Sequence, residues 1–373
     1  MNSVSIGLLL PNSTVTPMGK DFEKGLKKAL HDLQDSWEIE IIPEFIAEGS
    51  RDKADQAINK CLSYHDVDVV SGILSNKVIG ALSDKMEKSN KAFLFSNMGE
   101  YVPDMNLISP SVYLNSTNVW QHVWALGNWG VKEFGPKGMF VSGLYDAGYS
   151  FAMMLQMGMK AGSDQATMPF AVAPVPSPGA AADVAAVFQH IETFAPDFVF
   201  AAFCGDEAAL FLEEYIKRGY HKRIPLLGLP LLIQPFTGAA EECVVYSAFT
   251  AAAEDQAEPD SARPEDFADK QFFNLGYESG LLLKEALKKG EPKKIKNSLA
   301  EVTIRSSRGS LSALAGKQGS ASRIFLIKNT LGINGELSRE VQGELETIFI
   351  DDPKLKEILA LPSSGWFNPY PAV

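Results

Sequence analysis

Short apolar runs alternate with longer amphipathic stretches from the beginning of the chain. We expect four of the runs in the first part to be buried β-strands: Val4–Leu10, Ile39–Phe45, Val67–Ile73 and Ala92–Phe95. The stretches between them have apolar residues at helical spacing and predict helices over Lys20–Leu33, Asp52–Tyr64 and Lys77–Lys88. Apolar runs that lack strict polar alternation and are separated by helices are typical of a parallel sheet covered on both faces.

A second series of the same kind follows a helical stretch at Val119–Phe134. Its expected strands are Gly138–Ser142, Met168–Ala173, Phe198–Phe203, Pro225–Leu229 and Val244–Phe249, and its expected helices are Tyr149–Lys160, Val184–Phe194 and Glu207–Lys217. After these, the pattern predicts a surface loop at Ala252–Pro264 and helices at Phe267–Lys288 and Ile295–Leu299. Hairpin-like strands are expected around Ile304, Leu311 and Ile324–Ile327, and an aromatic tail on the surface at Ser363–Val373.

Two series of strands and helices predict two α/β lobes. The chain has 373 residues, which is more than a single hydrophobic core usually serves. Open parallel sheets bind their ligands at the carboxyl ends of the strands. If the two lobes face each other by these ends, the space between them is a ligand cleft, and the polar turns after the strands form its wall.

Composition narrows the function mainly by exclusion. The net charge of −12 opposes non-specific binding to nucleic acid or to an anionic membrane. No apolar stretch reaches the roughly 18 residues of a membrane span. The opening "SVSIGLLLPN" has no basic segment and no small-residue cleavage site, so a leader is not expected. The protein therefore either stays in the cytoplasm or has already lost a leader.

Residue types that carry chemistry are sparse and scattered. The cysteines Cys61, Cys204 and Cys243 are too few and too far apart for a disulfide framework or a zinc ribbon. The histidines are dispersed over helical patterns or their edges: His31, His65, His122, His190 and His221. The sequence also has no GxSxG, Walker, HExxH or GxGxxG motif. We expect no catalytic residue, no metal and no cofactor.

Several segments resemble the periplasmic type I solute-binding proteins of ABC transporters, in particular the branched-chain amino-acid (Leu/Ile/Val) receptors. They are "SIGLLLP", "KADQAINKCLSYHDVDVVSGILSN" and "KAFLFSN" in the first lobe, and "PDFVFAAFCGDEAALFLEEYIKRGYHKRIPLLG", "FFNLGYESGLLLKEALKKG" and "RGSLSALAGKQGSASRIFLIK" later. The resemblance implies an α/β fold with two doubly wound parallel-sheet lobes, three hinge crossings and a small ligand enclosed between the lobes. We expect residues 1–119 and 250–327 to form lobe 1, and residues 120–249 and 328–373 to form lobe 2.

The turn after the third strand is the first candidate ligand site. First-turn N–H groups of a helix lack intrahelical partners and lie at the positive end of its dipole, where a carboxylate is stabilised. By its position within "SGILSN", Asn76 takes the place of the family's ligand-binding serine, and Ser75 is its neighbour. Plain helix capping also explains these residue types, and the two roles are compatible.

The turn after the fourth strand departs from the family. It contains Ser96, Asn97, Gly99 and Glu100, where the family presents small residues whose amides and hydroxyl hold the ligand carboxylate. An acidic Glu100 repels an anion unless it is neutralised or points away, and a solvent-facing side chain is the alternative interpretation. If Glu100 faces the cleft, an ordinary amino acid fits poorly in the family's orientation.

The second lobe departs further from the residues typical of the family. Phe203 matches the family's aromatic position, but Pro230 stands where a glutamate holds the ligand's ammonium. A buried ammonium without an acid costs several kcal/mol, so the amino-acid specificity does not carry over. Tyr149 either presents its ring and hydroxyl to a ligand or packs at a helix start, and we interpret Asp146 as a helix cap.

The first loop of the chain adds rim candidates, Asn12, Ser13 and Met18, although loop polarity also explains the polar residues among them. Together these residues predict a cleft that is less charged and more aromatic than that of an amino-acid receptor. The expected ligand is a small organic acid or amide, with an aromatic body among the candidates, held by amides and hydroxyls of lobe 1 and by rings of lobe 2.

The resemblance implies an extracytoplasmic receptor that closes two lobes around a small polar solute without chemistry. Its expected partners are the solute and ABC permease subunits, with no nucleic acid and no membrane insertion, and the expected state is a monomer in the periplasm or at the cell surface. The alternatives are a ligand-sensing module of the same fold that reports to a partner protein and, third, an enzyme.

Overall fold

The computed structural model describes residues 2–13, 15–177, 180–234, 238, 241–251, 270–289, 294–312, 323–333 and 335–360. The chain separates into two compact units, Met1–Asn118 with Ala251–Ser322 and Val119–Thr250 with Arg323–Ala372. The chain therefore passes from one unit to the other after Asn118, after Thr250 and after Ser322. The expected loop at 252–264, the first residues of the helix expected from Phe267 and the tail at 363–373 lie outside the described residues.

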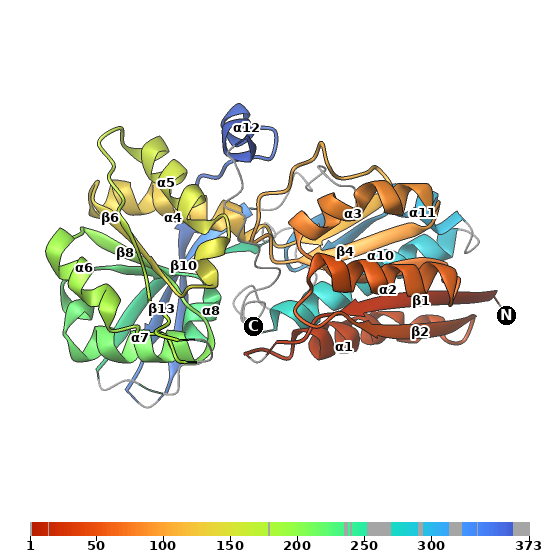
Figure 1. Cartoon of the computed structure of the whole chain (residues 1–373), viewed down its shortest axis with the longest axis horizontal. Coiled ribbons are helices and arrows are strands. Elements are labelled where there is room, and N and C mark those ends of the chain that lie inside the picture. Colours follow the sequence, from red (N-terminus) through yellow and green to blue (C-terminus); the bar gives the residue numbers. More distant parts are fainter. Residues whose placement is uncertain are drawn as a thin grey trace. The chain divides into compact units, whose positions relative to one another are not determined.

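Unit 1 is built on a parallel sheet with helices on both faces (Figure 1). Its strands lie in the order β2 (Trp37–Phe45), β1 (Asn2–Leu10), β3 (Val69–Ile73), β4 (Ala92–Asn97) and β5 (Val112–Ser116). Its other elements are α1 (Met18–Leu30), η1 (His31–Leu33), α2 (Arg51–Ser63), α3 (Asn76–Lys88), α10 (Gln271–Lys289), α11 (Ile295–Ala300) and the hairpin of β11 (Thr303–Ser306) and β12 (Gly309–Ser312). This strand order reverses direction between β1 and β3, the place where open sheets bind ligands.

Unit 2 repeats this strand order and extends it. Its sheet has the order β14 (Leu337–Glu344), β13 (Arg323–Leu331), β10 (Cys243–Ala251), β9 (Leu226–Gly228), β8 (Phe198–Ala202), β6 (Gly138–Ser142) and β7 (Phe170–Val172). Its helices are α4 (Val119–Phe134), η2 (Asp146–Gly148), α5 (Phe151–Gly162), α6 (Ala186–Phe194), α7 (Gly205–Lys217), η3 (Tyr220–Lys222), α8 (Pro230–Ile233) and α12 (Pro353–Leu359). The reversal of strand order here lies between β6 and β8.

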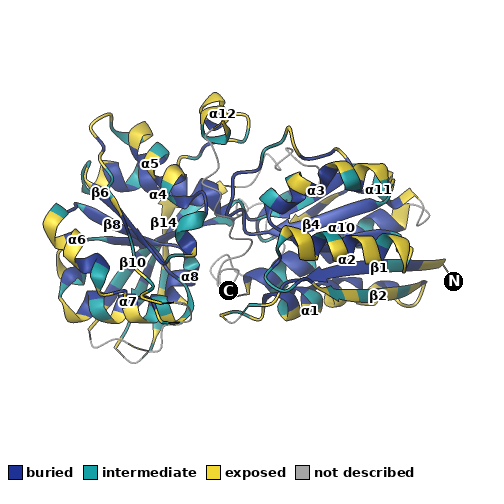
Figure 2. Ribbon diagram, viewed as in Figure 1, coloured by how far each residue is buried: buried dark blue, intermediate teal, exposed yellow. Residues whose placement is uncertain are grey.

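Each sheet is buried by side chains of the helices that cover it. In unit 1, Ile58 and Cys61 of α2 and Val78 of α3 pack with Val70 and Phe93 of the strands. Figure 2 shows the central strands of both units buried and the outward faces of the helices exposed. Burial on both faces explains why the strands appear in the sequence as continuous apolar runs.

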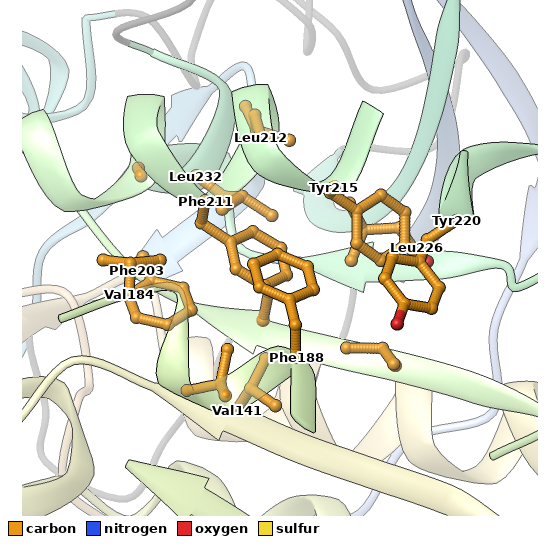
Figure 3. Close-up of a cluster of buried hydrophobic side chains, with 14 of the residues drawn as sticks. Val141, Val184, Phe188, Phe203, Phe211, Leu212, Tyr215, Tyr220, Leu226 and Leu232 are labelled. Atoms are coloured by element: carbon orange, nitrogen blue, oxygen red, sulfur yellow. The ribbon is translucent and has the colours of Figure 1, made fainter. Parts of the chain in front are cut away.

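Aromatic rings fill one core layer of unit 2 (Figure 3). Phe211 of α7 stacks on Phe188 of α6 at 5.4 Å between ring centroids, and Phe188 stacks on Tyr220 at 5.6 Å. Stacked aromatic pairs stabilise a core beyond the apolar area they bury. This layer fixes α6 and α7 against β6 and β8.

The α/β class and the parallel-dominated sheets predicted from the sequence are confirmed by the structure. The elements that the pattern does not predict include β5, β14, α8 and α12. β5 is short and ends in the polar residues Asn115 and Ser116, β14 is an exposed strand that pairs antiparallel with β13, and α8 and α12 are short helices. None of these four forms the long apolar or amphipathic pattern on which the prediction depends. Among the described residues, no helix combines the length and the apolar character that crossing a membrane requires.

Helices α1 and α10 approach each other closely because glycines lie at their contact. A β-carbon at Gly25 would lie 2.0 Å from the Phe273 carbonyl oxygen, and one at Gly276 would lie 2.0 Å from the Phe22 carbonyl oxygen. Side chains larger than hydrogen therefore cannot occupy either position without moving the helices apart. The pair joins the beginning of the chain to the long late helix in one unit.

We expect Gly276→Ala to lower the free energy of unfolding by about 3 kcal/mol, because the added methyl group overpacks a backbone contact. Urea unfolding followed by circular dichroism measures the change. Lys24→Ala is the control, because the Lys24 side chain is 59% exposed and the change should stay within about 0.5 kcal/mol. Equal stability of the two variants would contradict the close helix contact.

Candidate functional site at the carboxyl ends of the strands

The polar turns after β3 and β4 lie side by side in unit 1. The two strands are parallel neighbours, with Ile73 paired to Ser96 at their ends. Ser75 caps α3, and its Oγ accepts a hydrogen bond from the Val78 N–H at 3.4 Å. The first turn of α3 therefore begins directly at the carboxyl edge of the sheet, with its N–H groups and the positive end of its dipole at this edge.

A chain of amide hydrogen bonds joins the two turns. The Asn97 Nδ2 donates to the Leu74 carbonyl at 3.1 Å and to the Asn76 Oδ1 at 2.8 Å. The Asn76 Nδ2 in turn donates to the Tyr101 carbonyl at 2.8 Å. The Asn97 Oδ1 accepts from the Gly99 N–H at 3.0 Å. Both asparagines are buried, so their side chains primarily fix the shape of this wall.

The structure places the other predicted residues of unit 1 in different surroundings. Ser96 is buried and its Oγ lies 2.8 Å from the Ser279 Oγ of α10. Met18 is buried in the first turn of α1, whereas Asn12 is exposed and its backbone N–H donates to the Ala47 carbonyl. Ser13 accepts hydrogen bonds from the Val15 and Thr16 N–H groups. Of the four, Asn12 is the most accessible.

Glu100 is fully buried, so the solvent-facing interpretation of this residue is wrong. Neither carboxyl oxygen has a hydrogen-bond partner among the described residues. Burial raises the pKa of Glu100 to about 8, and the nearby N–H groups of Gly99 and Glu100 oppose this shift only in part. The side chain is therefore a neutral carboxylic acid at neutral pH.

Lys77 of α3 and Tyr101 of the loop after β4 contact each other. The Lys77 ammonium lies 4.2 Å from the centre of the Tyr101 ring. Burial lowers the pKa of Lys77. Stacking of an ammonium on an aromatic face is favourable and holds the lysine against the loop.

A buried ion pair, Arg308 with Glu278, lies at the carboxyl end of β5, the strand next to β4. The Arg308 Nε and Nη2 donate to the Glu278 carboxylate at 3.1 and 2.5 Å. The same guanidinium donates to the Asn115 Oδ1 at 2.6 Å and to the Ser116 carbonyl at 2.8 Å. Removing one partner of such a pair leaves a buried charge and costs about 3–5 kcal/mol. The network ties α10, the turn of the β11–β12 hairpin and the end of β5 together.

Acidic groups gather at the corresponding edge of unit 2. Asp146 is 5% exposed, and the Cys204 Sγ donates to its carboxylate at 3.6 Å. Burial, and then the nearby charge of Glu207, raise the pKa of Asp146 to about 7. Burial also raises the pKa of Glu207. Asp146 begins the short helix η2 and caps no helix through its side chain, so the prediction of a capping role is wrong.

The two aromatic residues predicted as ligand contacts in unit 2, Tyr149 and Phe203, lie in different surroundings. Tyr149 follows η2 and precedes α5, and its ring centroid lies 5.3 Å from that of Phe151. Phe203 is 2% exposed and stacks on Phe211 at 4.9 Å inside the core layer (Figure 3). Pro230 is the first residue of α8. Phe203 is therefore a core residue, and its role as a ligand contact stays a prediction.

The groups at these two edges differ in kind. Burial raises the pKa of the Cys204 thiol far above neutral, so a reactive thiolate does not form there. Among the described residues, no group of at least three His, Cys, Asp or Glu side chains could hold a metal ion. What the edges offer is hydrogen-bond donors in unit 1, and carboxyl groups and rings in unit 2.

Sequence reasoning missed three features of these edges. They are the burial of Glu100, the Asp146–Cys204–Glu207 group and the Arg308–Glu278 pair. The last had a visible sign, because Glu278 interrupts the apolar pattern of "FFNLGYESGLLL". The partners of the other groups come from distant parts of the chain, and spacing alone does not reveal them.

We expect Glu100→Gln to raise the free energy of unfolding by several kcal/mol near pH 8. Because burial raises the pKa of Glu100 from 4.5 to about 8, the native state keeps a proton that the unfolded state releases, and stability falls as the pH rises through this window. The glutamine has no such proton, so the difference should vanish near pH 4. Denaturant unfolding at a series of pH values measures it, and parallel profiles for the two proteins would contradict a neutral Glu100.

We expect Phe203→Ala to lower the free energy of unfolding by about 3–5 kcal/mol, because it opens a cavity in the ring layer. Phe203→Leu keeps most of the volume and should cost about 1.5 kcal/mol or less. Chemical denaturation of both variants tests this, and an alanine variant as stable as the wild type would remove Phe203 from the core.

Comparison with known proteins agrees with this arrangement. Residues 3–326 match the family described as periplasmic binding protein. No curated protein matches the chain. An ABC transporter substrate-binding protein from Sphaerobacter thermophilus is similar in structure at a TM-score of 0.70 and 19% identity, covering 93% of this chain and 98% of its own.

Two further solved structures are similar at lower identity. A solute-binding protein from Rhodopseudomonas palustris in complex with benzoate has a TM-score of 0.67 and 18% identity, with 93% of this chain and 98% of that chain covered. A leucine-binding protein from Thermotoga maritima has a TM-score of 0.63 and 15% identity, with 92% and 99% covered. The resemblance found in the sequence is confirmed: the chain belongs to the periplasmic binding protein family.

Proposed function

We propose that the protein is an extracytoplasmic solute-binding receptor of an ABC transporter. In this proposal its two units are the lobes, with boundaries near residues 119, 250 and 327, and they close on a small organic solute and release it unchanged. A ligand favours the closed state by its differential affinity for that state. The expected partners are ABC permease subunits, and the expected working state is a monomer in the periplasm or at the cell surface.

The observation that carries the proposal is the first turn of α3 at the carboxyl edge of the unit 1 sheet. The turn begins beside the capping residue Ser75 and next to Asn97 of β4. A helix N-terminus in this position binds a carboxylate without a charged side chain. Of the predicted ligand contacts, Ser75, Asn76, Ser96, Asn97, Gly99 and Glu100 belong to this edge, Asn12 belongs to the loop after β1, and Met18 begins α1.

The ligand class follows from what this edge accepts. Similar proteins are solved with benzoate, 4-hydroxybenzoate, 3,4-dihydroxybenzoic acid or isoleucine, and each of these ligands has a carboxyl group. The donors of the α3 turn suit that shared group. We therefore propose a small organic acid, with Tyr149 contacting its body in unit 2.

Asp146 supports a second ligand class, an amino acid. Pro230 removes the acid that holds an ammonium in the branched-chain receptors, but the carboxyl groups of Asp146 and Glu207 lie at the same kind of strand end. An ammonium beside them would lower their raised pKa values. Calorimetry with benzoate, 4-hydroxybenzoate, leucine and isoleucine decides between the two classes.

A sensing module of the same fold is the alternative function, because ligand closure is the same physical event there. Co-purification with permease subunits supports transport, and co-purification with a signalling partner supports sensing. Turnover of a bound ligand would indicate an enzyme.

We expect Ser75→Asp to weaken binding of the best-binding acid at least about tenfold, because it places a negative charge at the helix end that receives the carboxylate. Aspartate and asparagine both cap helices well, so Ser75→Asn is a neutral control of matched size that should keep more of the affinity. Isothermal calorimetry measures both variants. Equal affinities would contradict a ligand carboxylate at this turn.

A further inference from the structure

We propose that Glu100 determines ligand specificity as a neutral carboxylic acid that donates its hydrogen bond to an oxygen of the bound solute. This inference rests on the proposed function and adds to it that binding of a carboxylate is linked to one proton on the receptor. The ligand class it names is an oxyanion, and specifically a small carboxylate.

The loop that carries Glu100 is anchored on both sides of it. The Gly99 N–H donates to the Asn97 Oδ1 at 3.0 Å, and the Tyr101 carbonyl accepts from the Asn76 Nδ2 at 2.8 Å. Gly99 has a φ of +76°, and a β-carbon there would lie 2.5 Å from the Asn118 Cα. The backbone is therefore fixed on both sides of Glu100, by Asn97 before it and by the first residue of α3, Asn76, after it.

The Glu100 carboxyl group is buried without the hydrogen bond that a buried polar group normally makes. Both oxygens are covered and neither has a hydrogen-bond partner among the described residues. Buried polar groups are nearly always paired, and an exception calls for an explanation. A solute oxygen at this edge would supply the missing acceptor. Because the carboxyl is covered in this structure, its flexible side chain must turn to meet the solute.

The surrounding charges leave the proton in place. Charged groups near this loop include Lys77 of α3, which lies over Tyr101, and Arg308 of the hairpin turn, which donates to the Ser116 carbonyl and pairs with Glu278 of α10. Glu278 and Arg308 pair with each other, and none of the three contributes to the raised pKa of Glu100, which burial causes. Tyr101, in the same loop, lies under Lys77.

A neutral acid and an ionised acid select opposite ligands. The neutral form has an O–H donor, which adds to the N–H donors of the α3 turn and favours an oxyanion. The ionised form only accepts hydrogen bonds, repels a carboxylate and favours an ammonium. The direction in which affinity changes with pH therefore distinguishes the two.

Isothermal calorimetry with benzoate and leucine from about pH 6 to about pH 9.5 tests the proposal. We expect the affinity of the wild type for the carboxylate to fall about tenfold per pH unit above about pH 8, as Glu100 loses its proton. Glu100→Gln keeps a donor without titrating, so its affinity should lie within about threefold of the wild-type value at pH 6 and stay constant. Glu100→Met, without a donor, should lose at least about tenfold at every pH.

Glu87→Gln is the control, because Glu87 is an exposed residue near the far end of α3, and this variant should show the wild-type pH profile. An affinity that rises with pH, or loss of binding in Glu100→Gln alone, would overturn the proposal in favour of an ionised Glu100. Carbon-13 NMR of the glutamate carboxyls, assigned with Glu100→Gln, reads the titration without ligand. An ordinary pKa of Glu100 would overturn its proposed role even if a solute binds. A raised pKa of Glu100 together with no binding of benzoate or leucine would overturn both this role and the proposed function.

Discussion

The amide hydrogen bonds between Asn97 and Asn76 are the constraint on which the wall of unit 1 depends. Two parallel strands end here in polar turns that are buried, and every buried N–H and C=O must find a partner. Asn97 supplies partners to Leu74 and Gly99, and Asn76 supplies one to Tyr101. The asparagine side chains thus fix the backbone, which leaves the N–H groups of the α3 turn and the Glu100 carboxyl as the chemistry of this edge.

The two units share a strand order but carry different polar groups after their strands. Both reverse their strand order at one point, and both place polar residues after the strands at that point. Unit 1 presents donors there, and the buried Arg308–Glu278 pair lies at the end of β5 in the same sheet. Unit 2 presents Asp146 and Cys204 in front of a core layer of stacked rings.

The sequence was sufficient for the fold because buried parallel strands and amphipathic helices leave a strong pattern. It failed for β5 and β14, whose polar positions reflect an edge or a partly exposed face. Ser75, Asn76 and Asn97 do lie at neighbouring strand ends, as expected, whereas their role as ligand contacts stays a prediction. Side-chain orientation was not predicted, because the burial of Glu100 and of Phe203 depends on tertiary packing that the pattern does not contain. A rotation of a side chain changes its role without changing the pattern.

Hydrogen exchange measured by mass spectrometry, with and without the acid that binds best, tests the central claim most directly. We expect slower exchange of amides in the first turn of α3 and in the Asn97–Tyr101 loop when the acid is bound, because their N–H groups then face a ligand. Unchanged exchange in both segments, with protection only elsewhere, would contradict a site at the carboxyl ends of β3 and β4.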